Sequence, residues 1–517
     1  MHCILDPYKL WPKPKSFEAV AESECSLRGD FRFEATDSSA DSRHMARLNS
    51  AVQRSNENMA SIIARFPSIV APVCQVSWCT VRVEKPSAPL RSATPSESYE
   101  LSFGSNCQLS CKTAYGCMAG LSTFVQLVNP VRKYLVPGSF KIVDEPSFSH
   151  RGLLLDTSRH FLPKDVILKH IETMAMTKLN VLHWHIVDDH SFPFQSSSFP
   201  NLTRAGAFAP SATYSHEDIR FIVEFAADRG IRVIPEIDIP GHTASWMRGY
   251  PELLGRAKSA LDPTREKNYD FIESLLTEVR DVFKSDLFEG LPVIHVGGDE
   301  TWDGWDTEAV RSWMTEHGMT TNKDLIQYWM RRISGIAKNL NIKLIMWEDF
   351  LETVKDDTSH FSDEDNHISW QTWRRDLSAS IGLSKRINRD VIFSTDFYLD
   401  HLDLAWPDLY AVDMQQAPGL IGAEACMWGE VVDESNIYTR VWPRAAAVAE
   451  RLWCGSQCAL KASVDAAVRL ARWRCRMIYF FRVGGMEPIG SVVADSPDRM
   501  WTYHTDREQW WCEEADI

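Results

Sequence analysis

Residues 151–189 read RGLLLDTSRHFLPKDVILKHIETMAMTKLNVLHWHIVDD and contain two short apolar runs separated by a longer amphipathic segment. The runs at 152–155 and 180–185 have the length of buried strands. The segment between them is long enough for a helix, and Pro163 suits its first helical position. Strand, helix and strand in this order form the βαβ unit of a parallel sheet. We therefore expect an α/β fold for this part of the chain.

The same alternation continues towards the C-terminus and gives eight candidate strands. They lie at 152–155, 180–185, 231–237, 293–296, 343–347, 367–370, 391–394 and 421–428. Capping-box spacings at Ser215 with Asp218 and at Thr321 with Asp324 predict helix starts, and Gly230 suits a position just past a helix. Eight strands with intervening helices in roughly 300 residues favour a (β/α)8 TIM barrel over a doubly wound sheet.

The segments on either side of this region do not continue the alternation of strands and helices. Residues 1–137 combine β-rich runs with one helical pattern at 114–127, which predicts a smaller α+β domain before the barrel. The barrel is expected at 138–454. Residues 455–517 are expected to form a C-terminal helical extension packed on the barrel, helical around 462–481. A single continuous domain is the alternative organisation.

Composition excludes several classes of protein. The chain has 517 residues, and 55 Lys and Arg against 70 Asp and Glu give a net charge of −15, so no nucleic-acid partner is expected. No apolar run is long enough to span a bilayer, and prolines and charges interrupt residues 1–20, so no secretory signal is visible there. The 12 cysteines are too sparse for a disulfide-held scaffold, and no pair has the spacing of a zinc or redox motif.

The residues that follow the candidate strands are almost all ionic or aromatic. In a barrel these positions meet at the C-terminal face, where active sites lie. Carboxylates and an arginine bind sugar hydroxyls, aromatic faces pack on the C–H faces of a pyranose, and no phosphate-binding loop is present, so a neutral carbohydrate is the expected partner. The positions are Asp156, Arg159, Asp188, Asp189, Glu236, Asp238, His242, Asp299, Glu300, Trp347, Trp373, Asp396, Tyr398, Asp400, Trp428 and Glu430.

The two adjacent carboxyls Asp299 and Glu300 pose a geometric problem. Glycoside hydrolysis usually needs two carboxyl groups on opposite sides of the sugar ring. Neighbouring residues on a regular strand point to opposite faces, so both can face one pocket only where the strand has ended and the chain turns. Even then they are poorly placed for the usual acid and nucleophile. One of the two therefore needs a different role.

Five motifs in order resemble the family 20 glycoside hydrolases, the β-N-acetylhexosaminidases, and most closely the animal lysosomal enzymes and their eukaryotic relatives. They are RGLLLDTSRH at 151–160, LHWHIVDD at 182–189, DIPGH at 238–242, HVGGDE at 295–300 and EACMWGE at 424–430. The likeness covers nearly the whole chain. It implies an exo-acting, retaining enzyme that removes terminal N-acetylglucosamine or N-acetylgalactosamine and needs no cofactor and no metal.

The resemblance also assigns roles to the site residues. In this family the 2-acetamido oxygen of the substrate is the nucleophile, so only one acid is required. Glu300 is implied as that acid and Asp299 as the partner of the acetamido N–H, while Tyr398 should hydrogen-bond the acetamido oxygen. Trp347, Trp373 and Trp428 should surround its methyl group. Arg159 and Glu430 should bind hydroxyls, Asp188 and His242 should tune the acid, and Asp400 resembles members that prefer uncharged sugars.

The chain departs from the family in several places. No cysteine lies between Cys117 and Cys426, so the disulfide near the acid in animal members cannot form, whereas Cys475 and Cys512 can pair as in relatives. A lysosomal or secreted location is implied by the resemblance although no signal peptide is visible. A homodimer is one assembly that the resemblance allows, and Asn201 begins a glycosylation motif, Asn-Leu-Thr.

Two alternative functions stay open at the level of sequence. His183 and His185 at a barrel strand end, with Asp299 or His242, have the composition of a metal-dependent hydrolase site. A catalytically inactive sugar-binding barrel would keep the same rim but would not need an intact Glu300.

Overall fold

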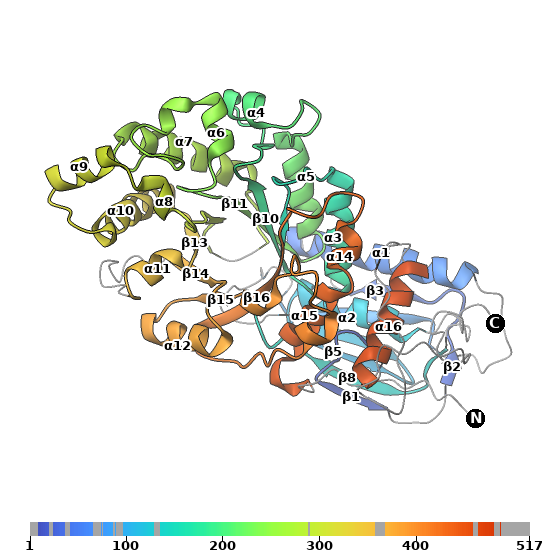
Figure 1. Cartoon of the computed structure of the whole chain (residues 1–517). Helices are drawn as coiled ribbons and strands as arrows, with labels where there is room; N and C mark the ends of the chain where they lie inside the picture. Colours follow the sequence, from blue (N-terminus) through green and yellow to red (C-terminus); the bar gives the residue numbers. More distant parts are fainter. Residues whose placement is uncertain are drawn as a thin grey trace.

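The structure is a computed structural model of the 517-residue chain. It describes residues 9–19, 24–36, 42–65, 74, 76–85, 88, 97–128, 135–287, 290–356, 368–458, 464–479 and 486. Figure 1 shows a closed barrel ringed by helices and, beside it, a sheet formed by the N-terminal part of the chain.

The barrel consists of eight parallel strands, as the alternation in the sequence predicts. Neighbouring strands pair around the ring, and β16 closes it by pairing with β9. His367, the expected start of the sixth strand, lies outside the described residues. The strands are β9 (His150–Asp156), β10 (Val181–Val187), β11 (Arg232–Ile237), β12 (Val293–His295), β13 (Lys343–Trp347), β14 (Ile368–Thr372), β15 (Val391–Phe393) and β16 (Leu420–Met427).

Helices surround the strands. The two predicted capping boxes are confirmed at Ser215 and Thr321, and Gly230 has the expected positive φ of 73°. Pro163 was expected as a first helical residue but lies just before the helix, which begins at Lys164. The helices of this region are α3 (Lys164–Met176), α4 (Pro200–Gly206), α5 (His216–Ala227), α6 (Ala244–Gly249), α7 (Glu266–Val282), α8 (Trp302–Trp305), α9 (Glu308–Glu316), α10 (Asn322–Leu340), α11 (Asp349–Thr353), α12 (Leu377–Ile387), α13 (Trp406–Tyr410), α14 (Ile437–Val441) and α15 (Arg444–Cys454).

The N-terminal part forms a six-stranded mixed sheet of order β1-β8-β5-β6-β4-β3. The expected helix at 114–127 is α2 (Ala114–Leu127), and it contacts α1 (Arg43–Arg65) as well as the sheet. The strand β8 lies beyond the boundary expected at residue 137, so we propose the domain junction between β8 and β9. The strands are β1 (Ser16–Ala19), β3 (Arg32–Ala35), β4 (Trp78–Val83), β5 (Tyr99–Phe103), β6 (Cys107–Cys111) and β8 (Phe140–Asp144); β2 (Glu24–Ser26) pairs with β7 (Leu135–Pro137).

Disulfides are concentrated in this N-terminal part. Three of the four among the described residues lie in this part, and the fourth joins the last residue of α15 to Cys458. Cys426, in β16, is a buried free thiol. Cys512, the expected partner of Cys475, lies outside the described residues. The disulfides are Cys25–Cys74, Cys79–Cys107, Cys111–Cys117 and Cys454–Cys458.

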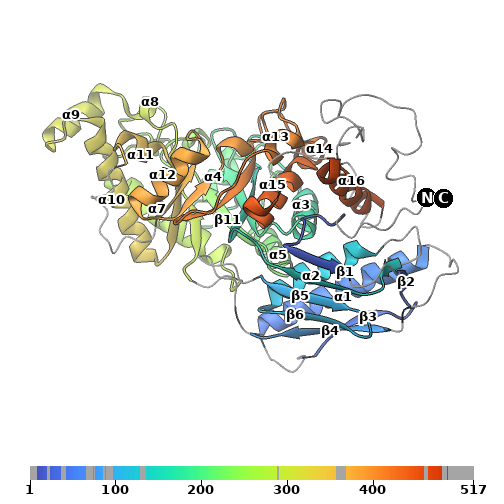
Figure 2. The same cartoon turned by 90° about the horizontal axis from the view of Figure 1, so that it is seen from below.

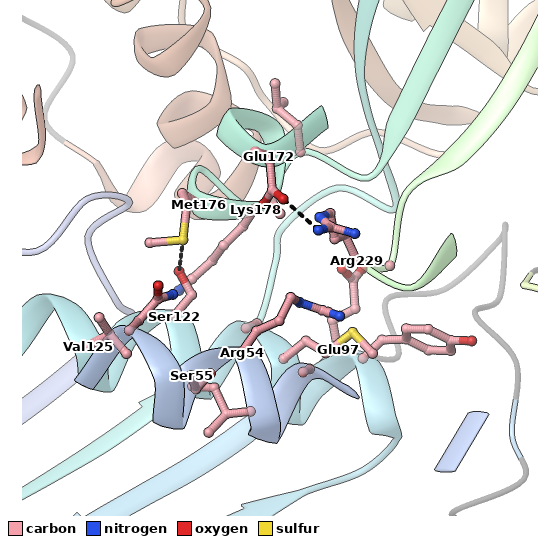
Figure 3. Close-up of a pocket in the computed structure, with 18 residues that line it drawn as sticks. Arg54, Ser55, Glu97, Ser122, Val125, Glu172, Met176, Lys178 and Arg229 are labelled. Atoms are coloured by element: carbon pink, nitrogen blue, oxygen red, sulfur yellow. Dashed lines mark hydrogen bonds and ion pairs between the residues drawn. The ribbon is translucent and has the colours of Figure 1, made fainter. Parts of the chain in front are cut away.

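The N-terminal domain joins the barrel through its helices. Figure 2 shows α1 and α2 between the sheet and the barrel. A cavity of about 110 Å3 lies at this junction. Among the residues that line it, Figure 3 shows Glu172 directed at Arg229, and Glu172 Oε1 lies 2.5 Å from Arg229 Nη2. Nearby, Lys178 is 3.0 Å from Asp144 of β8. Because Lys178 precedes β10, the N-terminal domain braces the end of the barrel opposite to the C-terminal ends of the strands.

The C-terminal helix α16 (Val464–Tyr479) packs on the barrel region. Arg469 Nη1 lies 2.7 Å from Glu450 Oε2, and the rings of Trp473 and Trp442 are 6.1 Å apart. The division of the chain into three units stays our proposal. None of the helices in the described part of the chain is long and apolar enough to cross a bilayer.

Candidate active site

The predicted rim residues meet at the C-terminal ends of the strands, and Arg159 connects them. Its Nη1 lies 3.0 Å from Asp156 Oδ2, and its Nη2 lies 2.9 Å from Asp188 Oδ2. Glu430, from the far end of β16, is 3.8 Å from the same Nη2. Charge-assisted hydrogen bonds of this kind are stronger than neutral ones and fix geometry. Arg159 therefore ties the loops after β9, β10 and β16 into one surface.

The chain turns sharply where Asp299 and Glu300 follow β12. The strand ends at His295, and Gly297 has φ of 62°, where a side chain would overlap Asp238. Glu300 itself has φ of 50°, in the left-handed region that non-glycine residues adopt uncommonly. This is the turn that the two carboxyls require. Asp299 is 14% exposed and Glu300 is 59% exposed.

A line of charged groups leads from Asp188 to the two carboxyls. His242 Nδ1 lies 3.4 Å from Asp188, and its Nε2 lies 3.4 Å from Asp299 and 3.8 Å from Glu300. Burial lowers the pKa of His242, but the carboxylates of Asp238 and Asp299 outweigh it and raise that pKa well above its usual value. His242 is therefore an imidazolium that holds the acidic groups in place.

The same cation keeps Asp299 ionised. Burial alone would raise the pKa of Asp299, but His242 lowers it below the usual value. Asp299 Oδ1 is buried and accepts no hydrogen bond from the described residues. A buried carboxylate oxygen without a donor is costly unless a ligand supplies one.

Aromatic side chains form a wall next to Asp299. The rings of Trp373 and Tyr398 are stacked 6.4 Å apart, and Trp428 lies 6.4 Å from Tyr398 and 5.9 Å from Trp347. These side chains pack as one apolar cluster whose buried members include Leu154. Burial raises the pKa of Tyr398 well above its usual value, so its hydroxyl keeps the proton and can donate a hydrogen bond.

Two further carboxyls line the rim beyond Arg159. Asp400 Oδ1 is buried without a partner in the described part of the chain, and burial raises the pKa of this carboxyl. Glu430 is half exposed. Beside them lies a hollow of about 440 Å3, lined by Arg159, His160, Phe161, His190, Phe208 and Glu430. The rim thus offers polar groups to hydroxyls next to an open space.

The sequence interpretation did not single out Asp349, which lies two residues after the end of β13. Its Oδ2 accepts a hydrogen bond from Trp373 Nε1 at 2.8 Å, and its Oδ1 accepts one from the Glu300 backbone N–H at 3.3 Å. Burial and the charge of Asp299 raise the pKa of Asp349 to about 6. A carboxylate that follows a strand is the signal that could have identified Asp349; the predicted end of the strand at Trp347 is confirmed, and Trp347 was the residue chosen there.

Two of the rim residues lie to the side of this cluster. Asp189 accepts a hydrogen bond from the backbone N–H of Ala244 at the start of α6, 2.7 Å away. Asp396 lies in a short 3-10 helix, and burial raises its pKa. Among the described residues, neither Asp189 nor Asp396 forms a hydrogen bond or ion pair with Asp299 or Glu300.

The histidines of the alternative metal site are held by carboxylates inside the barrel. His183 lies 2.8 Å from Glu424 and 3.1 Å from Glu236, and His185 lies 2.6 Å from Glu236 and 2.9 Å from Asp188. Both ring nitrogens of each histidine therefore face carboxylate oxygens, whereas a metal ligand must keep one nitrogen for the ion. His183 and His185 are therefore better placed to be protonated imidazolium ions paired with carboxylates than to bind a metal ion.

Comparison with known proteins decides the family. The model of the glycosyl hydrolase family 20 catalytic domain matches residues 148–456, and a model described as beta-acetyl hexosaminidase like matches residues 10–127. The chain belongs to glycosyl hydrolase family 20. Both the barrel and most of the N-terminal sheet are therefore parts of the family's architecture.

Curated family members are similar over most of the chain. Human beta-hexosaminidase subunit beta is 37% identical over 395 residues, which cover 72% of this chain and 68% of that protein. Beta-hexosaminidase 1 of Arabidopsis thaliana is 39% identical over 401 residues, covering 74% of this chain and 71% of the relative.

Solved structures of the family share the fold. The chitobiase of Flavobacterium johnsoniae superposes with a TM-score of 0.77 at 25% identity, covering 92% of this chain and 73% of that one. An N-acetyl-beta-hexosaminidase of Streptomyces plicatus, in complex with thio-NAglucal, superposes with a TM-score of 0.70 at 22% identity, covering 96% of this chain and 98% of that one.

Proposed function

We propose that this family 20 enzyme is an exo-acting β-N-acetylhexosaminidase, which removes terminal N-acetylglucosamine or N-acetylgalactosamine with retention of configuration. One observation carries the proposal. Asp299 is an ionised, mostly buried carboxylate near the aromatic wall and the Tyr398 hydroxyl, and its Oδ1 accepts no hydrogen bond from the described part of the chain. An acetamido group has the matching parts: an N–H donor, a methyl group and a carbonyl oxygen.

In this proposal the site grips the acetamido arm from three sides. Asp299 accepts its N–H and stabilises the positive charge of the oxazolinium intermediate. Tyr398 keeps its proton and donates a hydrogen bond to the acetamido oxygen, which attacks the anomeric carbon. Trp347, Trp373 and Trp428 surround the methyl group. Positioning an internal nucleophile in this way can lower the barrier by about 7–11 kcal/mol.

Glu300 is the proposed general acid and later the base. It protonates the glycosidic oxygen as the C1–O bond breaks, and then takes a proton from the water that opens the oxazolinium ring. Its half-exposed position suits a group that must meet the leaving group and water. Asp188 and His242 form the line that tunes it. Arg159, Asp400 and Glu430 are the proposed partners of the terminal sugar's hydroxyls.

Hydrolysis of an aryl N-acetyl-β-glucosaminide tests the function. The wild type should release the aryl group and the β anomer of N-acetylglucosamine. An aryl β-glucoside, which lacks the 2-acetamido group, should be a very poor substrate. No turnover of either compound would favour the inactive sugar-binding barrel, and turnover abolished by a strong chelator would favour the metal-dependent hydrolase.

A lysosomal or secreted location is part of the same proposal. The four disulfides among the described residues support it, because disulfides persist in oxidising compartments. Asn201, which begins the glycosylation motif, is exposed at the start of α4. Sensitivity of the expressed protein to an N-glycosidase would test both points, and light scattering would test the homodimer.

A further inference from the structure

We infer that Glu236, buried below the pocket, is a positioning residue that braces the acetamide cage and the acid line at the same time. The inference rests on the proposed function and adds a residue that contacts no substrate. Glu236 lies in β11 and is fully buried. A buried carboxylate costs several kcal/mol unless it is paired, so its partners reveal its role.

The first partner belongs to the acetamide cage. Trp347 Nε1 donates a hydrogen bond to Glu236 Oε1 at 2.8 Å. This is the indole that forms the deepest part of the aromatic wall, 1% exposed at the end of β13. His295 Nδ1 shares the same oxygen at 3.1 Å. One oxygen of Glu236 therefore fixes the plane of Trp347.

The second partner begins the line to the acid. His185 Nδ1 lies 2.6 Å from Glu236 Oε2, and His185 Nε2 lies 2.9 Å from Asp188 Oδ2. Asp188 in turn faces His242, which lies between it and the two catalytic carboxyls. Three side chains, His185, Asp188 and His242, thus connect the second oxygen of Glu236 to Glu300, each within 4 Å of the next.

Charge keeps this series in one arrangement. Burial raises the pKa of Glu236, but His295, His185 and His183 outweigh it and hold that pKa well below its usual range. Burial lowers the pKa of His185, but Glu236 and Asp188 raise it well above the usual value. Asp299 adds negative charge nearby, whereas burial and the charges of Asp299 and Glu236 raise the pKa of Asp238 well above its usual value. Glu236 is therefore an ionised carboxylate held between imidazole rings.

Glu236→Gln tests the inference, because an amide of the same shape can accept a hydrogen bond through only one of its two ends. We expect kcat for an aryl N-acetyl-β-glucosaminide to fall about 100-fold with little change in KM, the size of effect that a misplacement of about 1 Å produces. Glu424→Gln is the matched control. Glu424 is also buried in the barrel and paired with His183, but among the described residues it forms no hydrogen bond or ion pair with Trp347 or His185.

Double-mutant cycles separate positioning from general damage. In the Trp347→Phe and Asp188→Asn backgrounds, the factor by which Glu236→Gln lowers kcat should be at least threefold smaller than in the wild type. The factor by which Glu424→Gln lowers kcat should be the same in all backgrounds. Equal costs of Glu236→Gln in all backgrounds, at unchanged KM and with the fold intact by circular dichroism, would overturn the inference. An inactive wild type would instead contradict the proposed function.

Discussion

Two layers inside the barrel differ completely although they belong to the same strands. The lower layer is apolar and contains Val181, Ile234, Ile345 and Ile392. Two residues further along the chain, the positions hold His183, Glu236 and Trp347 on the strands, where side chains point the same way, and Ser394 just past the end of β15. Buried charges are costly, so the charged groups of the second layer indicate a role other than packing. Substitutions in the two layers should therefore act on different properties.

The largest expected effect on kcat comes from a substitution at the C-terminal rim of the barrel, above the second layer. Glu300→Gln should lower kcat about 10²–10⁴-fold, because general acid catalysis contributes that much. The loss should shrink for aryl leaving groups of low pKa, which depart without protonation. Initial rates on a series of substituted phenyl N-acetyl-β-glucosaminides would measure this. A loss that is equal for all leaving groups would contradict the role of Glu300 as acid.

A smaller effect is expected from Tyr398→Phe in the aromatic wall. Removing the hydroxyl takes away one donor to the attacking amide, which should lower kcat about 10²–10³-fold. Tyr410→Phe is the matched control, since its buried hydroxyl donates to Glu450 at 2.8 Å far from the rim. The control should keep the wild-type kcat. Similar kcat values for Tyr398→Phe and Tyr410→Phe would remove Tyr398 from the mechanism.

Asp349 should make the free energy of unfolding depend on pH. Burial and Asp299 raise its pKa to about 6, above the value of about 4 in an unfolded chain. The folded state therefore binds this proton more tightly, and the stabilisation is full below pH 4 and is lost as the pH rises through 6.

The wild type should thus lose about 2–3 kcal/mol of unfolding free energy relative to Asp349→Asn between pH 4 and 7, because each pKa unit corresponds to about 1.4 kcal/mol. Urea unfolding of both proteins across this range measures the difference. Parallel curves for the two proteins would show that Asp349 titrates normally.

The smallest effect is expected in the apolar layer. Ile392→Val removes one buried methylene and should cost about 0.5–1.5 kcal/mol of unfolding free energy. The pH profile of kcat should match that of the wild type. A shifted profile would mean that the two layers are coupled and that the contrast between them is false.

The sequence predicted the barrel well because its signals are local. Alternating apolar runs and capping boxes such as Ser215 with Asp218 depend on neighbours in the chain. The end of the N-terminal domain was missed because β8 joins its sheet through pairing with β1 and β5, which are distant in sequence. Such pairing leaves no local mark.

Site residues that directly follow strands could be predicted from the sequence. Residues whose role depends on a hydrogen-bond partner distant in the chain could not. Asp299 and Glu300 were predicted from their position, and the turn that brings both to one pocket was predicted from the alternation of side chains. The roles of Asp349 and Glu236 depend on which indole each one meets, Trp373 and Trp347 respectively. Those contacts join strands that lie far apart in the chain.

The measurement that tests the central claim most directly is the rate on substrates whose 2-acetamido methyl group carries one, two or three fluorine atoms. Fluorine withdraws electron density from the carbonyl oxygen and weakens it as a nucleophile. If the sugar's own amide attacks the anomeric carbon, kcat/KM should fall steadily with each fluorine. A rate independent of fluorination would mean that another group attacks and would contradict the mechanism built on Asp299 and Tyr398.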